Sequence, residues 1–509
     1  MAPQATIHVF PAHKLNPISR NIYSGFTEHM GRCIYGGITD PTNPNTHLLT
    51  SSPSSFRKDV ISTLAPLEIP IFRYPGGNFT ATYHWADGVG PLPRPRRPNL
   101  AWGGQIEDNS FGTNEFITWC REHMHSEPYL CLNMGTGTLD EALNWIEYCN
   151  STGESHYAAL RREHVGHDRP HAVKYWGLGN EVWGPWQIAQ TVDPKLYAET
   201  AMQWAKAIKL LDPSIKLVLC GSDGVQSWDW EVIKRAIQPA TMSDLGVNQP
   251  PLIDYVSIHM YTASTDYHEN VFAPLAAERA IQNTGCLIDL ACAENKVPAG
   301  QARPSICFDE WNVWDPKRAV GSTGAEERYT LSDALAVGVW LNVFVRQSQG
   351  VGMACIAQSV NVISPLMTTL DGIVKQTSWY VYELFCRFVK GDRVDFVVHC
   401  DTYTGSTKPE WLGGVPGVKL RWLDVSACVD EEGWAVLSVV NLHKEEDIET
   451  SLGGIETGKE VEIYSVTGRD VDVNNMDGVE EVRIVESKWK AETTFTFPKH
   501  SFTLLRFQV

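Results

Sequence analysis

Residues 175–186 read Y-W-G-L-G-N-E-V-W-G-P-W, a short apolar run that ends in Asn180 and Glu181. Residues 306–314 read I-C-F-D-E-W-N-V-W and repeat this design, because an apolar run again ends in acidic residues, here Asp309 and Glu310. Short apolar runs of this length are typical of buried parallel strands. Each run therefore predicts a strand that places a carboxylate at its carboxyl end.

Similar runs recur along most of the chain and alternate with longer helical patterns between about residues 20 and 390. The expected strands are 22–29, 69–75, 128–134, 173–179, 215–221, 253–261, 305–310 and 354–360. Eight strand-then-helix units are the number in a (β/α)₈ barrel, also called a TIM barrel. An open doubly wound sheet is the alternative, but no G-x-G-x-x-G follows the first strand.

Caps and periodicity place four of the helices between these strands. They are expected at 138–150, 194–211, 327–346 and 376–389. Thr138 and Glu141 form a capping box at the start of the first of them. Pro194 follows Asp193, which is a capping residue followed by a favoured first-turn proline. These signals support the α/β class.

The pattern changes after about residue 390, where short alternating runs separated by Gly, Asn and Asp replace the helices. Such runs are typical of a β-sandwich. Thr6 to Phe10 also looks like a strand and is expected to join it. The resulting division is 1–17 for an N-terminal strand of the sandwich, 18–388 for the catalytic barrel and 389–509 for a jelly-roll-like β-sandwich.

Composition narrows the class of protein. The 509 residues carry 42 basic and 60 acidic side chains, a net charge of −18, which disfavours binding to nucleic acid or anionic membranes. The longest apolar run, Ala334 to Val345, is too short to span a bilayer. The N-terminus lacks the features of a signal peptide, so we expect an intracellular, cytoplasmic protein.

The 12 cysteines include no C-x-x-C pair, and we interpret them mainly as small buried hydrophobes. A disulfide between one pair of them is the alternative.

The strand-end side chains indicate the chemistry. Glu181 and Glu310 end strands four and seven and should face each other across the barrel mouth. Cleavage of a glycosidic bond needs two carboxyl groups, one to protonate the leaving oxygen and one to attack or stabilise the anomeric carbon. The many aromatic residues, 18 Trp among them, also suit sugar-binding walls. Other strand ends supply polar groups: Glu28, Arg73, Asn78, His259, Tyr261, Gln358 and Asn361.

Other chemistries find less support. No G-x-S-x-G or H-E-x-x-H motif occurs, and Gly76-Gly77 is not followed by the Lys-Ser/Thr of a phosphate loop. His164, His167 and His171 have helical spacing, but Gly166, Asp168 and Pro170 favour a loop before strand four. We therefore expect no metal and no cofactor.

Six motifs in order resemble glycoside hydrolase family 51, the α-L-arabinofuranosidases of the retaining clan A barrels. They are F-T-E-H-M-G-R-C-I-Y-G-G, R-Y-P-G-G-N-F, L-N-M-G-T-G-T, G-N-E-V-W-G-P-W, D-E-W-N-V-W and A-Q-S-V-N-V-I. The resemblance implies a barrel with a β-sandwich, an arabinofuranose-containing carbohydrate as substrate and a homo-oligomer. The sequence departs from the usual pattern around residues 85–105, a loop that includes the Pro/Arg-rich stretch 91–98 and is a candidate for lining outer subsites.

The resemblance also implies roles for individual residues. Glu181 is similar to the general acid/base and Glu310 to the nucleophile. Arg73 and His259 match positions that support the nucleophile. The residues implied to contact the sugar ring or wall the pocket are Glu28, Asn78, Asn180, Tyr261, Gln358, Trp102 and Trp183.

These roles imply a retaining double displacement that releases terminal non-reducing α-L-arabinofuranosyl residues. Its two carboxyl groups should lie roughly 5–5.5 Å apart. We also expect a raised pKa for Glu181, because an acid must begin protonated and a second carboxylate lies near. A related β-xylosidase or endo-β-1,4-glucanase on the same barrel is the alternative function, and a catalytically silent sugar-binding protein is a more distant one.

Overall fold

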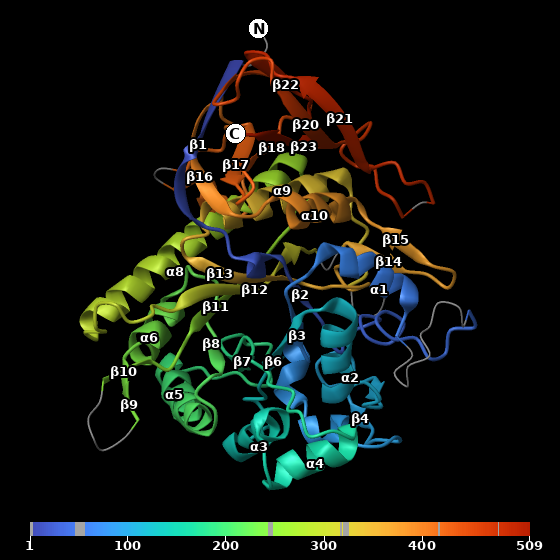
Figure 1. Cartoon of the computed structure of the whole chain (residues 1–509), viewed down its shortest axis with the longest axis vertical. Coiled ribbons are helices and arrows are strands. Elements are labelled where there is room, and N and C mark those ends of the chain that lie inside the picture. Colours follow the sequence, from blue (N-terminus) through green and yellow to red (C-terminus); the bar gives the residue numbers. More distant parts are fainter. Residues whose placement is uncertain are drawn as a thin grey trace.

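The computed structural model describes residues 4–45, 56–242, 248–315, 318, 325–415, 418–476 and 478–509. Eight parallel strands close into a barrel in chain order, which confirms the (β/α)₈ prediction (Figure 1). The barrel strands are β2 (Ser24–Phe26), β3 (Ile71–Tyr74), β6 (Glu127–Cys131), β7 (Tyr175–Leu178), β8 (Lys216–Leu219), β11 (Tyr255–Thr262), β12 (Ser305–Val313) and β13 (Val351–Ile356). Every expected strand run overlaps one of them.

Helices follow the strands and surround the barrel. Their bounds are α1 (Lys58–Leu64), α2 (Thr113–Thr118), α3 (Leu139–Asn150), α4 (His156–Val165), α5 (Pro194–Leu211), α6 (Ser227–Ala236), α7 (Tyr267–Phe272), α8 (Leu275–Glu294), α9 (Leu331–Arg346) and α10 (Thr377–Phe388). The four predicted helices correspond to α3, α5, α9 and α10. The Thr138 hydroxyl accepts a hydrogen bond from the Glu141 N–H at 3.1 Å, and Asp193 caps α5 before Pro194.

One local prediction was wrong. His164 lies in helix α4, which ends at Val165, and not in a loop. Gly166 stops the helix instead of preventing it, because its φ of 75° is the left-handed conformation that commonly follows a helix end. The His164 ring contacts the Tyr148 hydroxyl at 3.1 Å, and His171 contacts Asn114 at 2.9 Å, so each has its own partner.

The strands after the barrel form one continuous mixed sheet that curls around its own apolar core. Its order is β21-β20-β23-β18-β17-β16-β1-β19-β22. The bounds are β1 (Gln4–Pro17), β16 (Asp392–His399), β17 (Leu423–Val429), β18 (Trp434–Asn441), β19 (Ile448–Gly453), β20 (Glu460–Val466), β21 (Ile484–Lys490), β22 (Thr494–Phe497) and β23 (Ser501–Gln508). The first strand pairs antiparallel with β16 and parallel with β19. This arrangement supports the proposed division at 17/18 and 388/389.

Helix α9 lies between the barrel and the curled sheet, beside α10 (Figure 1). It contains the longest apolar run of the chain, and all its residues but the last are buried. Its one interior amide, Asn342, donates to Asp424 Oδ1 at 2.8 Å and accepts from Ser426 and Ser438 of the sheet. The apolar run therefore belongs to a domain interface. Within the described residues, no helix is long and apolar enough to cross a membrane.

All 12 cysteines are free thiols, so the alternative of a disulfide is wrong. Nine of them are buried, as expected for small core residues. Burial raises the pKa of these thiols, for example that of Cys131 to about 11, so they stay protonated and unreactive near neutral pH.

Candidate active site

A pocket of about 490 Å³ opens at the carboxyl ends of the barrel strands. Its walls come from the ends of seven barrel strands and from the loops that follow them. The lining residues are Glu28, Met30, Gly77, Asn78, Trp102, Glu181, Trp183, Trp186, Asp223, His259, Met260, Tyr261, Glu310, Trp314, Gln358 and Ile363. Carboxylates at the base and indole rings at the sides give it the character of a sugar-binding pocket.

Glu181 follows β7 on a sharply turned backbone. Gly179 has φ 81° and Glu181 has φ 42°, so two of three consecutive residues adopt the left-handed conformation. A non-glycine residue holds this conformation only when its surroundings enforce it. The Glu181 carboxylate is enclosed by three donors: His259 Nδ1 at 3.1 Å, Gln187 Nε2 at 2.9 Å and Trp186 Nε1 at 3.1 Å.

Glu310 lies on β12 opposite Glu181. Arg73 of β3 donates to its Oε1 at 2.7 Å, and the Tyr261 hydroxyl of β11 donates to its Oε2 at 2.8 Å. The other terminal nitrogen of Arg73 donates to Asn180 Oδ1 at 2.6 Å. One buried guanidinium thus aligns the residues that follow two different strands.

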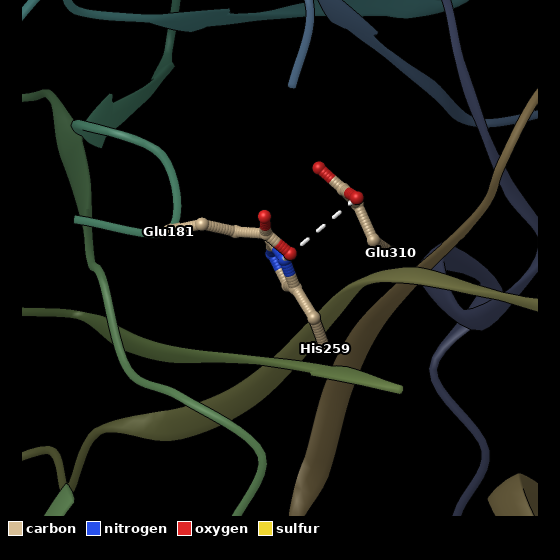
Figure 2. Close-up of side chains that lie close together, drawn as sticks. All are labelled: Glu181, His259 and Glu310. Atoms are coloured by element: carbon tan, nitrogen blue, oxygen red, sulfur yellow. Dashed lines mark hydrogen bonds and ion pairs between the residues drawn. The ribbon is translucent and has the colours of Figure 1, made fainter. Parts of the chain in front are cut away.

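The two glutamates converge on His259, as Figure 2 shows. One carboxylate oxygen of Glu181, one of Glu310 and a nitrogen of His259 all lie within 4.8 Å of one another. His259 Nδ1 is 3.7 Å from Glu310 Oε2, and its Nε2 is 3.1 Å from Asp309 Oδ1. The imidazole therefore stands among three carboxylates.

The charges in this cluster explain its pKa shifts. Burial opposes a charged His259, but Glu310 and Asp309 outweigh it and raise the His259 pKa to about 10. Burial likewise opposes a charged Asp309, but Arg73 and His259 hold its pKa well below the usual value. Near neutral pH His259 is an imidazolium, with both N–H groups donating to carboxylates. It then has no lone pair for a metal ion, although Glu181, His259 and Glu310 are spaced as three ligands would be.

The expected raised pKa of Glu181 was wrong for this unliganded site. Burial does favour the protonated form, but the hydrogen bond and charge of His259, with those from Gln187 and Trp186, hold the Glu181 pKa below its usual value. No local pattern indicates this contact, because Glu181 and His259 are 78 residues apart.

Glu28 follows β2 and is 2% exposed. Its carboxylate accepts hydrogen bonds from the Phe79 N–H at 3.0 Å, Trp102 Nε1 at 2.9 Å and Gln358 Nε2 at 3.1 Å. Burial, followed by the nearby charge of Glu310, raises its pKa to about 7. A Cβ on Gly76 would lie 2.6 Å from Glu28 Cγ, so the Gly-Gly pair is needed for close approach to this side chain.

The structure brings together the side chains selected from the sequence. Glu28, Asn78, Trp102, Glu181, Trp183, His259, Tyr261, Glu310 and Gln358 line the pocket, while Arg73 and Asn180 lie behind it. Asn361 lies apart and donates to the Arg32 carbonyl. Sequence reasoning missed Trp186 and Gln187 as partners of Glu181, although Trp186 ends the run that begins at Tyr175 and Gln187 follows it directly.

The loop of residues 85–105 meets the pocket at one side chain, Trp102, and the Pro/Arg-rich stretch 91–98 is not among the lining residues. A contribution of the loop to outer subsites stays a prediction. Arg94 is instead buried and makes two hydrogen bonds with Glu115, at 3.0 and 2.7 Å, and Arg97 pairs with Asp87 at the surface. Arg94 thus attaches the loop to α2, whereas Arg97 forms an ion pair within the loop.

A (β/α)₈ barrel that holds two closely spaced carboxylates in an aromatic-walled pocket defines a glycoside hydrolase. Two family profiles match the chain: "Alpha-L-arabinofuranosidase 1 domain" over residues 63–277 and "Alpha-L-arabinofuranosidase C-terminal domain" over residues 309–501. The chain is 58% identical to a probable α-L-arabinofuranosidase C of Aspergillus terreus, over 100% of this chain and 98% of the relative.

More distant relatives agree. An intracellular exo-α-(1→5)-L-arabinofuranosidase 1 of Bacillus subtilis is 34% identical over 93% of this chain and 92% of its own length. The structure of the thermostable GH51 α-L-arabinofuranosidase of Thermotoga petrophila superposes with a TM-score of 0.83 at 35% identity, covering 99% of this chain and 100% of the other. The chain belongs to glycoside hydrolase family 51 and is an α-L-arabinofuranosidase.

Proposed function

We propose that this enzyme is an exo-acting retaining hydrolase that releases terminal non-reducing α-L-arabinofuranosyl residues from oligo- or polysaccharides. Glu310 is the nucleophile and Glu181 the general acid/base. The observation that carries this proposal is the spacing of the two carboxylates, whose nearest oxygens lie within 4.8 Å. Retaining enzymes separate the two groups by about 5–5.5 Å, whereas inverting enzymes leave about 6.5–9.5 Å for a water molecule.

In the first step, a carboxylate oxygen of Glu310 forms a bond to the anomeric carbon while the bond to the leaving oxygen breaks. Arg73 and Tyr261 each donate a hydrogen bond to the nucleophile and fix its direction. Glu181 gives its proton to the leaving oxygen. In the second step Glu181 removes a proton from water, whose oxygen displaces Glu310 and restores the original configuration.

The proton for the first step has a nearby source. His259 holds a proton at neutral pH, and its Nδ1–H points at Glu181 Oε1 across 3.1 Å. Movement of that proton along the hydrogen bond converts Glu181 into the acid that the first step requires. The proposal therefore assigns the acidic proton to the Glu181–His259 pair and not to one residue alone.

Unpaired polar atoms support the assignment of sugar contacts. Within the described residues, Asn180 Nδ2 and Gln358 Oε1 are buried without a hydrogen-bond partner. A buried polar atom without a partner is costly, and a hydroxyl of the bound furanose would supply one. Glu28 and Asn78 add further polar contacts, with Tyr261 beside Glu310, and Trp102 and Trp183 as walls.

The cellular location and the oligomeric state of the enzyme also remain proposals. Short arabinose-containing oligosaccharides inside the cell suit the intracellular assignment, and the name of the Bacillus subtilis relative is consistent with it. A homo-oligomer is proposed from the family resemblance.

The test is turnover of nitrophenyl α-L-arabinofuranoside, β-D-xyloside and β-D-glucoside, with proton NMR of the first sugar released. We expect the arabinofuranoside to be preferred and the α anomer to appear first. Glu310→Gln should be almost inactive with an unchanged Tm. First release of the β anomer would exclude the retaining mechanism, and preference for the xyloside or glucoside would exclude the proposed sugar.

A further inference from the structure

Trp102 reaches the pocket from a loop that the barrel alone does not position. This Trp102 loop, residues 99–105, joins the two short strands β4 (Arg97–Pro98) and β5 (Ile106–Glu107). Trp102 is half-buried, and its indole N–H donates to Glu28 Oε1 at 2.9 Å. The position of the loop therefore determines whether Glu28 keeps this donor.

The end of the Trp102 loop is fastened by a buried carboxylate. Glu107 is 6% exposed and accepts hydrogen bonds from His29 Nδ1 at 2.8 Å, the Tyr35 hydroxyl at 2.5 Å and the Asn109 N–H at 2.8 Å. Burial alone would raise the Glu107 pKa, but His29, Tyr35 and Asn109 together hold it below the usual value. Glu107 is therefore ionised, and its His29 contact is strong.

His29 is the residue after Glu28, which gives this fastening a direct connection to the site. Its other ring nitrogen lies 2.9 Å from the Tyr74 hydroxyl. Its carbonyl accepts from Asn99 Nδ2 at 2.7 Å, and the same Asn99 accepts from the Trp102 N–H at 3.1 Å. The two ends of the Trp102 loop are thus both attached to the residue beside Glu28.

We propose that Glu107 is a positioning residue for the reaction, because its bond to His29 holds the Trp102 loop where the indole donates to Glu28. This inference rests on the proposed role of Glu28 and Trp102 in binding the sugar. A cavity of about 60 Å³ lies behind the loop, lined by His29, Asn99, Trp102 and Glu107 among others. Trp102 lines both this cavity and the catalytic pocket, so a shift of the loop would change the wall of both.

The test is a double-mutant cycle on kcat/KM for an aryl α-L-arabinofuranoside. Trp102→Phe keeps an aromatic wall but removes the N–H donor, and Glu107→Gln removes the charge that binds His29. Each single variant should lose about tenfold, as expected for one hydrogen bond to a charged group. The double variant should also lose about tenfold and not about a hundredfold, because both act on one contact.

Glu115→Gln is the matched control. Glu115 pairs with Arg94 in the neighbouring part of the same region but does not contact His29 or the Trp102 loop. The Glu115→Gln variant should have a lower Tm. In the double variant with Trp102→Phe, the two effects on kcat/KM should be additive. Glu107→Asp keeps the charge and should recover part of the activity that Glu107→Gln loses. It replaces Glu107→Gln as the test variant if that protein does not fold.

The outcomes distinguish a failure of the positioning role of Glu107 from a failure of the proposed role of Trp102. Additive losses for Glu107→Gln and Trp102→Phe would overturn the positioning role of Glu107 and leave the sugar-binding role of Trp102 intact. Unchanged kcat/KM in Trp102→Phe would overturn the proposed role of the Trp102 N–H itself. The positioning role requires two results. The losses of Glu107→Gln and Trp102→Phe must be non-additive, and those of Glu115→Gln and Trp102→Phe must be additive.

Discussion

His259 Nδ1 donates to Glu181 Oε1 at 3.1 Å, so the residue proposed as acid/base shares a hydrogen bond with an imidazolium. With the bonds from Gln187 and Trp186, this contact outweighs burial, which alone would raise the pKa of Glu181. The pH dependence of the enzyme should therefore report this pair of residues.

His259→Gln should move the basic limb of the kcat/KM profile to lower pH by about one unit or more. The His259 pKa of about 10 keeps a proton beside Glu181 at high pH, and without the imidazole that proton has to remain on Glu181 itself. The measurement is kcat/KM from pH 4 to 10. Tyr129→Phe, which removes only a hydrogen bond to Asp309, is the control and should leave the limb in place. An unchanged basic limb in His259→Gln would contradict the proposal that Glu181 and His259 share the acidic proton.

Glu181→Ala should slow hydrolysis of substrates with poor leaving groups by about 10²–10⁴-fold, the usual contribution of general acid catalysis. Dinitrophenyl leaving groups need little protonation, so formation of the glycosyl-enzyme from such a substrate should be nearly normal. Azide, which needs no general base, should then restore turnover and give an azide of retained configuration. Equal losses with both kinds of leaving group would show that Glu181 is not the acid.

Arg73→Lys should lower kcat/KM by about a hundredfold. A lysine retains the charge but lacks the planar fork that lets one side chain reach Glu310 at 2.7 Å and Asn180 at 2.6 Å. Two charge-assisted hydrogen bonds of this kind account for a loss of that size. Steady-state kinetics together with a thermal scan distinguish misalignment from unfolding. Activity within a few-fold of wild type would show that charge alone suffices at this position.

Glu28→Gln should stabilise the protein increasingly as pH rises. The folded-state pKa of Glu28 is about 7 against 4.5 for the free side chain, so the native state holds the proton more tightly. Ionising Glu28 therefore reduces stability as pH increases from about 4.5 through 7. The free energy of unfolding of the variant relative to wild type should rise by on the order of 2 kcal/mol between pH 5 and 8.

Denaturant unfolding at several pH values measures this difference. Glu449→Gln makes the same carboxylate-to-amide change at an exposed position on β19 and serves as the control. A constant difference for Glu28→Gln over the same range would contradict the raised pKa.

Much of the barrel could be predicted from the sequence because its signals are local. Each strand is a short apolar run, and each catalytic candidate lies near the carboxyl end of one or just after it. The order of Glu28, Arg73, Glu181, His259 and Glu310 around the mouth therefore follows from the topology. The caps of α3 and α5 are equally local. The wrong assignment of His164 shows the limit of such signals, because Gly166 ends a helix as readily as it prevents one.

The missing parts depend on contacts between distant segments. The pKa of Glu181 depends on His259 from another strand. The donors Trp186 and Gln187 reach Glu181 through the turns that join residues 181, 184 and 187. Likewise, nothing near Glu107 in the sequence indicates that it meets His29. Such contacts depend on tertiary structure and leave no periodic pattern in the chain.

Strand β1 also has a consequence for biosynthesis. It occupies an interior position of the curled sheet, yet its neighbours β16 and β19 begin only at residues 392 and 448. A ribosome that adds about 5–20 residues per second completes those partners on the order of half a minute after β1 has been made. Throughout that interval the segment Gln4–Pro17 has two unpaired strand edges, and a bound chaperone or the nascent barrel has to keep it from pairing with another chain.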